Sequence, residues 1–356
     1  MIQQPRVALS GYYGFDNAGD EAVLSGLVKN LYDCGIDLNC ITALSIAPAS
    51  TSADHGIESA HRYRPADVIR TLSQCNLLLS GGGSLLQDVT SAHGIFYYLA
   101  VVRAAQLMGK RTMFVAQGLG PLIRPASRKL VAAVANKLDA ITVRDEQSAS
   151  LLREIGVAHV PIEVTADPAL LLGIPASPRK TVPRFGVALR TWGEAVAVQN
   201  VCDACRSVFP LAEAALFSMQ PAQDEPVSEA FGAAWTKTGG KSLNLIYLSE
   251  AGLDSLVREI ASCEVIIAMR LHALILAAAC GIPSVALSYD PKVRAFMEFT
   301  GQGDACIDLS KQDSLQDVLR EVWTTRESRS VQLQTRLPNF VKAAKRNGEI
   351  AVGLIR

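Results

Sequence analysis

Short runs of apolar and β-branched residues alternate along the chain with segments whose apolar positions recur every three or four residues. The first pattern is typical of buried strands, and the second, seen from Val23 to Leu31, is typical of a helix with one apolar face. Strands that alternate with helices favour a parallel sheet with helices on both faces. In the first half, the pattern predicts strands at Val7–Leu9, Cys40–Leu44, Leu77–Leu79, Thr112–Val115 and Ala140–Val143.

The alternation stops at residues 173–184, a proline-rich stretch that we expect to link two domains. It resumes with predicted strands at Phe185–Leu189, Ala214–Phe217, Leu245–Leu248, Val265–Ala268, Ser284–Leu287 and Ala305–Leu309. We therefore expect an α/β protein with two Rossmann-like, doubly wound domains that face a cleft, over residues 1–176 and 184–335. Residues 336–356 are a candidate for a C-terminal helix that crosses back to the first domain.

The composition agrees with a globular two-domain protein. Of the 356 residues, 49% are hydrophobic and 19% are charged, and 34 basic residues balance 34 acidic ones. This supplies apolar side chains for two cores and gives no reason to expect a nucleic-acid partner. The most apolar window, Val265–Leu287, is interrupted by Arg270, His272, Gly281 and Pro283. We expect neither a secretion signal nor a membrane span, and hence a cytoplasmic protein with peripheral membrane association at most.

The cysteines also indicate a reduced compartment. Most of the eight lie in apolar runs, where a thiol behaves as a small hydrophobic side chain. Cys202 and Cys205 form a C-x-x-C motif without the second pair that a zinc site needs. We therefore expect structural thiols and no bound metal or cofactor.

One turn in the second half carries candidate chemistry. Arg270 and His272 fall where a buried strand meets an apolar helix, within the segment Glu264–Val293. A buried guanidinium needs a carboxylate, a ligand or water, and a helix N-terminus favours anions. We expect Arg270, Leu271 and His272 to bind an anionic ligand. A structural ion pair for Arg270 and a core position for His272 are the alternatives.

The first loop carries the opposite charge. In residues 6–24, RVALSGYYGFDNAGDEAVL, the predicted strand Val7–Leu9 leads into a glycine-rich loop and then a helix. The loop carries Asp16, Asp20 and Glu21, and these carboxylates would repel a phosphate. Carboxylates accept hydrogen bonds from hydroxyl groups and serve as bases. We expect Asp16 and Asn17 to contact a polyol, while Asp20 and Glu21 are helix N-terminal residues.

Further strand ends in the first half lead into polar or glycine-rich loops. Arg144 follows one strand, and Asp145 is expected to cap the next helix. Asp167 and Pro168 are interpreted as a turn. Glycines allow a ligand close to the backbone, although a tight turn that requires positive φ is an alternative explanation. The candidate sugar-binding residues in these loops are Gly81, Gly82, Gly83, Asp88 and Gln117.

Several of these segments together resemble a known family. The motifs GYYGFDNAGDEAVL, GGGSLLQD, AQGLGP, VRDEQS, ADPAL and RLHALILAAACGIPSVALSYDPKV follow one another between residues 9 and 293. Their order resembles the polysaccharide pyruvyl transferase family, specifically its bacterial CsaB type. Ala116 stands where a glycine of the family's GQG loop is expected.

The resemblance implies a fold similar to the two-domain GT-B glycosyltransferases. It also implies transfer of pyruvate from phosphoenolpyruvate onto two sugar hydroxyls, which forms a cyclic ketal and releases phosphate. The implied acceptor is N-acetylmannosamine in a lipid-linked precursor of a cell-wall polymer, of the kind that anchors S-layers. No cofactor is implied besides the donor substrate.

Candidate residues can be assigned for this reaction. Arg270 is the first choice for the donor's anionic groups, and Arg144 and Arg190 compete to be the second. His272 is the candidate for proton transfer, and Asp16 is the candidate base or hydroxyl anchor on the acceptor side. Lys292 and Ser288 complete the expected donor site. The alternatives are a nucleotide-sugar glycosyltransferase of the same fold and a non-catalytic sugar-binding relative.

Overall fold

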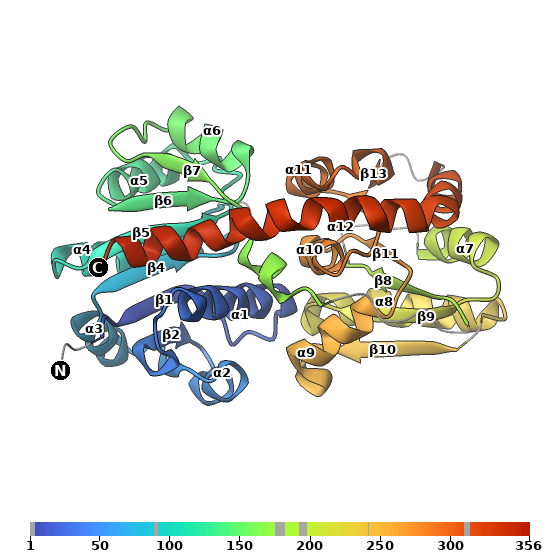
Figure 1. The fold of residues 1–356 in the computed structure, drawn as a ribbon, viewed down its shortest axis with the longest axis horizontal. Helices are drawn as coiled ribbons and strands as arrows, with labels where there is room; N and C mark the ends of the chain where they lie inside the picture. Colours follow the sequence, from blue (N-terminus) through green and yellow to red (C-terminus); the bar gives the residue numbers. More distant parts are fainter. Residues whose placement is uncertain (1–3, 89–91, 175–181, 192–197, 241, 310–313) are drawn as a thin grey trace. The chain divides into compact units, whose positions relative to one another are not determined.

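The computed structural model describes residues 4–88, 92–174, 182–191, 198–240, 242–309 and 314–356. These residues form two compact α/β units (Figure 1). Unit 1 contains Met1–Phe15, Asp20–Leu171 and Phe340–Arg356, and unit 2 contains Asp16–Gly19 and Leu172–Asn339. Most of the expected linker, residues 175–181, lies outside the described residues.

Unit 1 is built on a seven-stranded parallel sheet with the order β3-β2-β1-β4-β5-β6-β7. Its strands are β1 (Val7–Tyr13), β2 (Ile41–Ser45), β3 (Glu58–His61), β4 (Leu77–Gly81), β5 (Arg111–Gln117), β6 (Ala140–Val143) and β7 (Ile162–Val164). The helices that alternate with them are α1 (Ala18–Asp33), α2 (Pro48–His55), α3 (Pro65–Gln74), α4 (Ala92–Leu107), α5 (Pro125–Ala135) and α6 (Glu146–Glu154).

Unit 2 repeats the design with a six-stranded parallel sheet of order β10-β9-β8-β11-β12-β13. Its strands are β8 (Arg184–Ala188), β9 (Glu213–Ser218), β10 (Leu243–Tyr247), β11 (Val265–Ala268), β12 (Ser284–Ser288) and β13 (Cys306–Asp308). Its helices are α7 (Val198–Val208), α8 (Pro221–Lys237), α9 (Leu248–Ala261), α10 (Leu271–Ala279) and α11 (Pro291–Thr300), followed by α12 (Leu315–Gly353).

The two sheets confirm the predicted α/β class. Strands β4, β8, β11 and β12 are buried along their whole length, as expected for central parallel strands covered on both faces. In each sheet the order of the strands reverses at one neighbouring pair, β1 and β4 in unit 1 and β8 and β11 in unit 2. Ligands of open α/β sheets bind beyond the carboxyl ends of the strands at such a reversal.

The sequence pattern did not predict the edge strands β3 and β7. In β3, Glu58 is exposed and the other three residues are half-buried, and β7 ends on an exposed residue. An edge strand that is only partly buried needs neither a continuous apolar run nor a clear alternation, so it leaves a weak signal in the sequence.

A polar network ties the C-terminal segment into unit 1. The side chain of Asn347 in α12 is fully buried, and its Oδ1 accepts hydrogen bonds from Thr142 Oγ1 at 2.7 Å and Thr165 Oγ1 at 2.9 Å. Its Nδ2 donates to Ala166 O at 3.0 Å. Asn30 in α1 donates to Ala344 O at 3.1 Å. The expected terminal helix is therefore the last part of a longer helix, and its final turns complete the core of unit 1.

One residue of β5 has an unusual backbone conformation. Ala116 has a φ of +42°, in the left-handed region that favours glycine. The register between β5 and β6 shifts here, between Phe114 and Gln117, and Ala116 N donates to Thr142 Oγ1 at 2.8 Å. This conformation gives a physical reason for the glycine expected at this position.

Within the described ranges, no helix has both the length and the apolar character needed to span a membrane.

Candidate functional site

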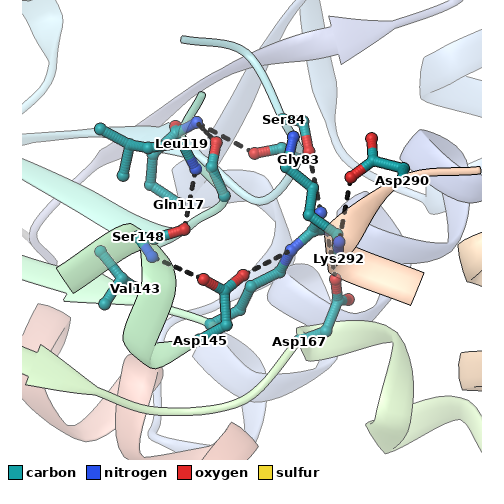
Figure 2. A network of polar contacts seen from close by, with 12 residues as sticks. Gly83, Ser84, Gln117, Leu119, Val143, Asp145, Ser148, Asp167, Asp290 and Lys292 are labelled. Atoms are coloured by element: carbon teal, nitrogen blue, oxygen red, sulfur yellow. Dashed lines mark hydrogen bonds and ion pairs between the residues drawn. The ribbon is translucent and has the colours of Figure 1, made fainter. Parts of the chain in front are cut away.

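A buried arginine organises the carboxyl ends of β4 and β6 in unit 1. Arg144 directly follows β6, and only 5% of its side chain is exposed. Its Nη1 donates to Asp167 Oδ2 at 3.0 Å and its Nη2 to Ser84 Oγ at 2.8 Å, while its Nε lies 3.8 Å from Asp145 Oδ2. Figure 2 shows Ser84, Asp145 and Asp167 in this network. Two carboxylates and a hydroxyl therefore compensate the buried guanidinium.

The turn after β6 is fixed by the predicted helix cap. Asp145 Oδ1 accepts a hydrogen bond from Ser148 N at 2.7 Å and so begins α6. Ser148 Oγ in turn accepts from Leu119 N at 2.9 Å (Figure 2). A Cβ on Gly118 would lie 2.8 Å from Arg144 Nε, so glycine is required where the guanidinium packs against this loop.

Gln117 joins the loops that follow β4 and β5. Its side chain is fully buried, and its Nε2 donates to Gly83 O at 3.0 Å and Gly118 O at 2.8 Å. Within the described part of the chain, its Oε1 is buried and has no hydrogen-bond partner. A buried acceptor without a partner is costly in a folded protein, so Oε1 could accept a ligand hydroxyl.

Asp88 holds the loop that leads into α5. Its two carboxylate oxygens accept hydrogen bonds from Ile123 N at 2.7 Å and Arg124 N at 2.9 Å. Burial opposes the charge, but these backbone donors outweigh it and hold the pKa of the Asp88 carboxyl below its ordinary value. This geometry indicates a role in positioning the loop, and sugar binding by Asp88 stays a prediction.

The first loop has its own internal order. Glu21 Oε1 accepts from Gly14 N at 2.7 Å, and its Oε2 lies 2.9 Å from His55 Nε2, so this carboxylate holds the loop against α2. Asn17 Oδ1 accepts from Gly19 N at 3.0 Å. Asp16 is exposed and has a φ of +54°. Asp20 lies against the glycine loop after β4, because a Cβ on Gly83 would come within 2.8 Å of its Oδ1.

Two arginines meet at the carboxyl ends of the strands in unit 2. Arg270 follows β11, and its Nε lies 3.0 Å from both carboxylate oxygens of Asp224, to which its Nη2 also donates. The side chain of Asp224 is 0% exposed, so this is a buried ion pair with the geometry of a fork. The structural ion pair that was the alternative for Arg270 is therefore present. Binding of the donor substrate by Arg270 stays a prediction.

Gln223 connects this arginine to a second one. Its Oε1 accepts from Arg190 Nη2 at 3.0 Å and from Arg270 Nη2 at 3.3 Å. Arg190 follows β8, and its Nη1 also donates to the hydroxyl of Tyr289 at 2.9 Å. The two guanidinium groups thus share an exposed amide at the strand reversal of unit 2, and Arg270 is also paired with the buried carboxylate of Asp224.

The other expected donor residues lie nearby in unit 2. Leu271 and His272 form the first turn of α10 and are half-buried. Ser288 ends β12, and its Oγ donates to Asp290 O at 3.2 Å. Asp290 caps α11 by accepting from Lys292 N at 2.9 Å (Figure 2). Contacts of these residues with a ligand stay predictions.

Sequence reasoning missed several partners of the arginines. Asp167 was interpreted as a turn residue, but it is the buried partner of Arg144. Gln223 and Asp224 were not proposed, although they lie in the first turn of α8, just beyond the carboxyl end of β9. The rule that selected Arg270, a polar residue at a strand-to-helix turn, would also have found them.

Comparisons with known structures agree with the fold. The structure of Anabaena Alr3699/HepE in complex with UDP-glucose is similar, with a TM-score of 0.65, 13% identity, and coverage of 98% of this chain and 99% of that one. The UDP-GlcNAc 2-epimerase from Neisseria meningitidis bound to UDP-GlcNAc has a TM-score of 0.62, 11% identity, and coverage of 99% of each chain. A glycosyltransferase from Rickettsia africae ESF-5 has a TM-score of 0.64, 10% identity, and coverage of 99% of this chain and 100% of that one. The predicted GT-B-like architecture is confirmed.

The sequence comparisons are more specific. No protein with a curated description matches the chain. A model of the family described as polysaccharide pyruvyl transferase matches residues 17–291, which include the end of the first loop from Asn17, the glycine loop, Arg144, Asp224 and the Arg270 turn. The chain therefore belongs to the polysaccharide pyruvyl transferase family and is a transferase.

Proposed function

We propose that this protein transfers a pyruvyl group from phosphoenolpyruvate to N-acetylmannosamine in a lipid-linked precursor of a cell-wall polymer, as in the CsaB branch of the family. Two hydroxyl oxygens of the sugar form bonds to C2 of the donor, and the bond from C2 to the phosphate oxygen breaks. One hydroxyl proton ends on the methylene carbon, which becomes a methyl group, and the other leaves with phosphate. The product is a cyclic ketal.

The observation that carries this proposal is the pair of arginines at the strand reversal of unit 2. Gln223 Oε1 accepts hydrogen bonds from Arg190 and Arg270 and so holds the two guanidinium groups beside each other. Phosphoenolpyruvate carries a phosphate and a carboxylate, and guanidinium groups bind such oxyanions in fork geometry. In unit 1, Arg144 lies among two carboxylates. The amide shared with Arg270 supports Arg190 as the second donor arginine, and the two carboxylates support Arg144 as a positioning residue.

The other roles follow from the chemistry. His272, two residues after Arg270, is proposed to carry the proton, because imidazole changes its charge near neutral pH. Asp16 is proposed to accept a sugar hydroxyl, with Asn17, the 81–83 glycines and the buried Oε1 of Gln117 as further contacts. The arginines supply electrostatic stabilisation for the departing phosphate, so the reaction as proposed requires no cofactor besides the donor.

The second candidate is a nucleotide-sugar glycosyltransferase. Its support is the fold shared with the Anabaena protein in complex with UDP-glucose. A sugar nucleotide also carries phosphates that two arginines could bind. The two candidates differ in the leaving group, which is inorganic phosphate in one case and a nucleotide in the other.

The test incubates the purified full chain with phosphoenolpyruvate and a lipid-linked disaccharide that ends in N-acetylmannosamine. We expect inorganic phosphate and the ketal to form in equal amounts, as measured by a phosphate assay and mass spectrometry. Nucleotide release from a UDP-sugar, without phosphate release from phosphoenolpyruvate, would reject the proposal in favour of the second candidate.

A further inference from the structure

Aromatic rings surround one buried guanidinium in unit 1. The central carbon of the Arg62 guanidinium lies 4.4 Å from the ring centre of Tyr97, 5.1 Å from those of Phe15 and Tyr63, and 5.2 Å from that of Tyr98. Distances of this size are typical of cation–π contacts. Tyr12 stacks on Phe15, with 4.0 Å between the ring centres and 5° between the planes. These rings around Arg62 are called the aromatic platform below: Tyr12, Phe15, Tyr63, Tyr97 and Tyr98.

Hydrogen bonds and a ring contact fix the side chains of the platform. Arg62 is buried, and its Nη1 donates to Gly11 O in β1 at 2.7 Å. The hydroxyl of Tyr97 donates to Arg62 O at 3.0 Å, which ties α4 to the end of β3. The rings of Tyr63 and Tyr97 meet edge to face at 5.4 Å. A surface whose side chains are fixed before a ligand arrives loses little conformational entropy on binding.

Part of the platform is open to solvent. The side chain of Tyr63 is 56% exposed, and Tyr12, Phe15 and Tyr97 are half-buried. Tyr98 is buried and lies beneath them. The core of unit 1 does not need an exposed tyrosine, whereas a ring held by a buried cation and left open on its other side is suited to contact a ligand.

The platform also lies beside the strand reversal of unit 1. Tyr12 belongs to β1, which pairs with β4 at that reversal, and the glycine loop follows β4. Asp20 links the two regions, because it lies against Gly83 and its charge acts on Tyr12. Burial, and then Asp20, raises the pKa of the Tyr12 hydroxyl, which therefore keeps its proton at neutral pH and can donate a hydrogen bond.

We propose that the aromatic platform binds a sugar ring of the acceptor, by stacking against its C–H face, while Asp20 accepts hydrogen bonds from its hydroxyl groups. The inference rests on the proposed function, in which the first loop and the glycine loop serve the sugar, and it gives a binding role to residues to which the sequence analysis assigned none. It assigns Tyr63 and Phe15 as specificity-determining contacts.

The chemistry of the platform favours a sugar ring over the other parts of the acceptor. A pyranose has a face of C–H groups and a rim of hydroxyl groups, which matches aromatic rings beside a carboxylate. A lipid tail would gain nothing from Asp20. A diphosphate would be repelled by Asp20, and the rings cover the Arg62 guanidinium that could attract it.

The test compares two tyrosines of equal exposure. Tyr63→Ser removes a platform ring, and Tyr32→Ser removes a ring in α1 that is also 56% exposed and belongs to the same unit. We expect Tyr63→Ser to raise the KM for the lipid-linked disaccharide about tenfold, the size of a lost aromatic contact, with the KM for phosphoenolpyruvate unchanged. Tyr63→Phe should keep the wild-type KM, and Tyr32→Ser should change neither constant.

Direct binding separates this inference from the proposed reaction. If the wild-type chain releases no phosphate from phosphoenolpyruvate, the proposed function fails. Calorimetry with the soluble disaccharide N-acetylmannosaminyl-N-acetylglucosamine still tests the platform, because stacking needs no donor. Equal disaccharide affinity of the wild type and Tyr63→Ser, with equal melting temperatures, would overturn the inference. So would a Tyr63→Ser variant that loses binding only to phospholipid vesicles.

Discussion

The arginines at the strand ends differ less in their positions than in the side chains that contact them. Arg144 directly follows β6, and Arg270 follows β11 after one further residue. Arg144 lies near Asp145 and Asp167, whereas Arg270 pairs with Asp224 and shares the side-chain oxygen of Gln223 with Arg190. A guanidinium between two carboxylates is suited to the scaffold, and two guanidinium groups on one amide at a strand reversal are the proposed anion site.

Arg270→Lys tests this distinction. Lysine keeps the charge but cannot hold Asp224 and a donor oxyanion with one planar fork. We expect the KM for phosphoenolpyruvate to rise at least tenfold, as for the loss of a hydrogen bond to a charged group. Steady-state kinetics measures the change, and Arg320→Lys on the exposed side of α12 is the control. An unchanged KM in a folded Arg270→Lys variant contradicts the assignment.

Asp88 predicts a pH dependence of stability. Its folded-state pKa is lower than that of the unfolded chain, so its hydrogen bonds stabilise the fold fully above the unfolded value. This contribution is lost as the pH falls from about 4 through the folded-state pKa. In urea titrations between about pH 7 and 3, the difference in unfolding free energy between the wild type and Asp88→Asn should stay constant down to about pH 5 and shrink as the pH falls below about 4. A difference that stays constant over this range excludes the backbone-anchored carboxylate as its source.

Ala116→Gly should stabilise the protein. The left-handed conformation costs an alanine about 1 kcal/mol or more, whereas glycine adopts it freely but has more entropy to lose on folding. The balance predicts a gain of up to about 1 kcal/mol in unfolding free energy, measured by urea titration. Ala132→Gly, inside α5, is the control, and it should lower the unfolding free energy by about 1 kcal/mol. A loss at both positions would show that Ala116 bears no conformational cost.

At the scale of elements, the central strands and the edge strands of unit 2 were predicted, and the edge strands β3 and β7 of unit 1 were not. The apolar runs at Ala140–Val143 and Val265–Ala268 match β6 and β11 residue for residue, because burial on both faces demands them. No such demand acts on β3. The candidate site shows the same limit, since Arg270 stands out within an apolar run, whereas Asp224 sits in a polar stretch, where the sequence does not indicate that its carboxylate is buried.

The last turns of α12 form part of the core of unit 1. Asn347→Ala would remove the closer acceptor of the Thr142 and Thr165 hydroxyls, which would keep only their longer hydrogen bonds to backbone carbonyls, and would create a small cavity. We expect a loss of about 2–4 kcal/mol in unfolding free energy, seen as a lower urea midpoint. Asn339→Ala changes an exposed asparagine of the same helix and should stay within about 0.5 kcal/mol of the wild type. A loss of the same size at Asn339 would contradict a specific role of the Asn347 network, because alanine has the higher helix propensity at both positions.

At the scale of the whole molecule, the order of segments along the chain does not match their division between the two units. Residues 340–356 belong to unit 1, although they follow all of unit 2 in the chain. A chain that ends at Asn339 should therefore keep the core of unit 2 around the buried Trp235 and lose the protection of unit 1. Hydrogen exchange should be faster in β5 and β6 than in the full chain, while β8 and β11 stay protected. Unchanged exchange in β6 would show that the terminal segment is dispensable.

Asn347 also has a consequence for biosynthesis. A ribosome releases the strands of unit 1 long before it reaches codon 347, so the hydroxyls of Thr142 and Thr165 must wait for this acceptor until all of unit 2 has been synthesised. Unit 1 is thus begun before most of unit 2 and finished after it, unlike domains that are completed one after another. A nascent chain arrested between codons 339 and 347 would expose this incomplete layer of unit 1 to proteases and chaperones.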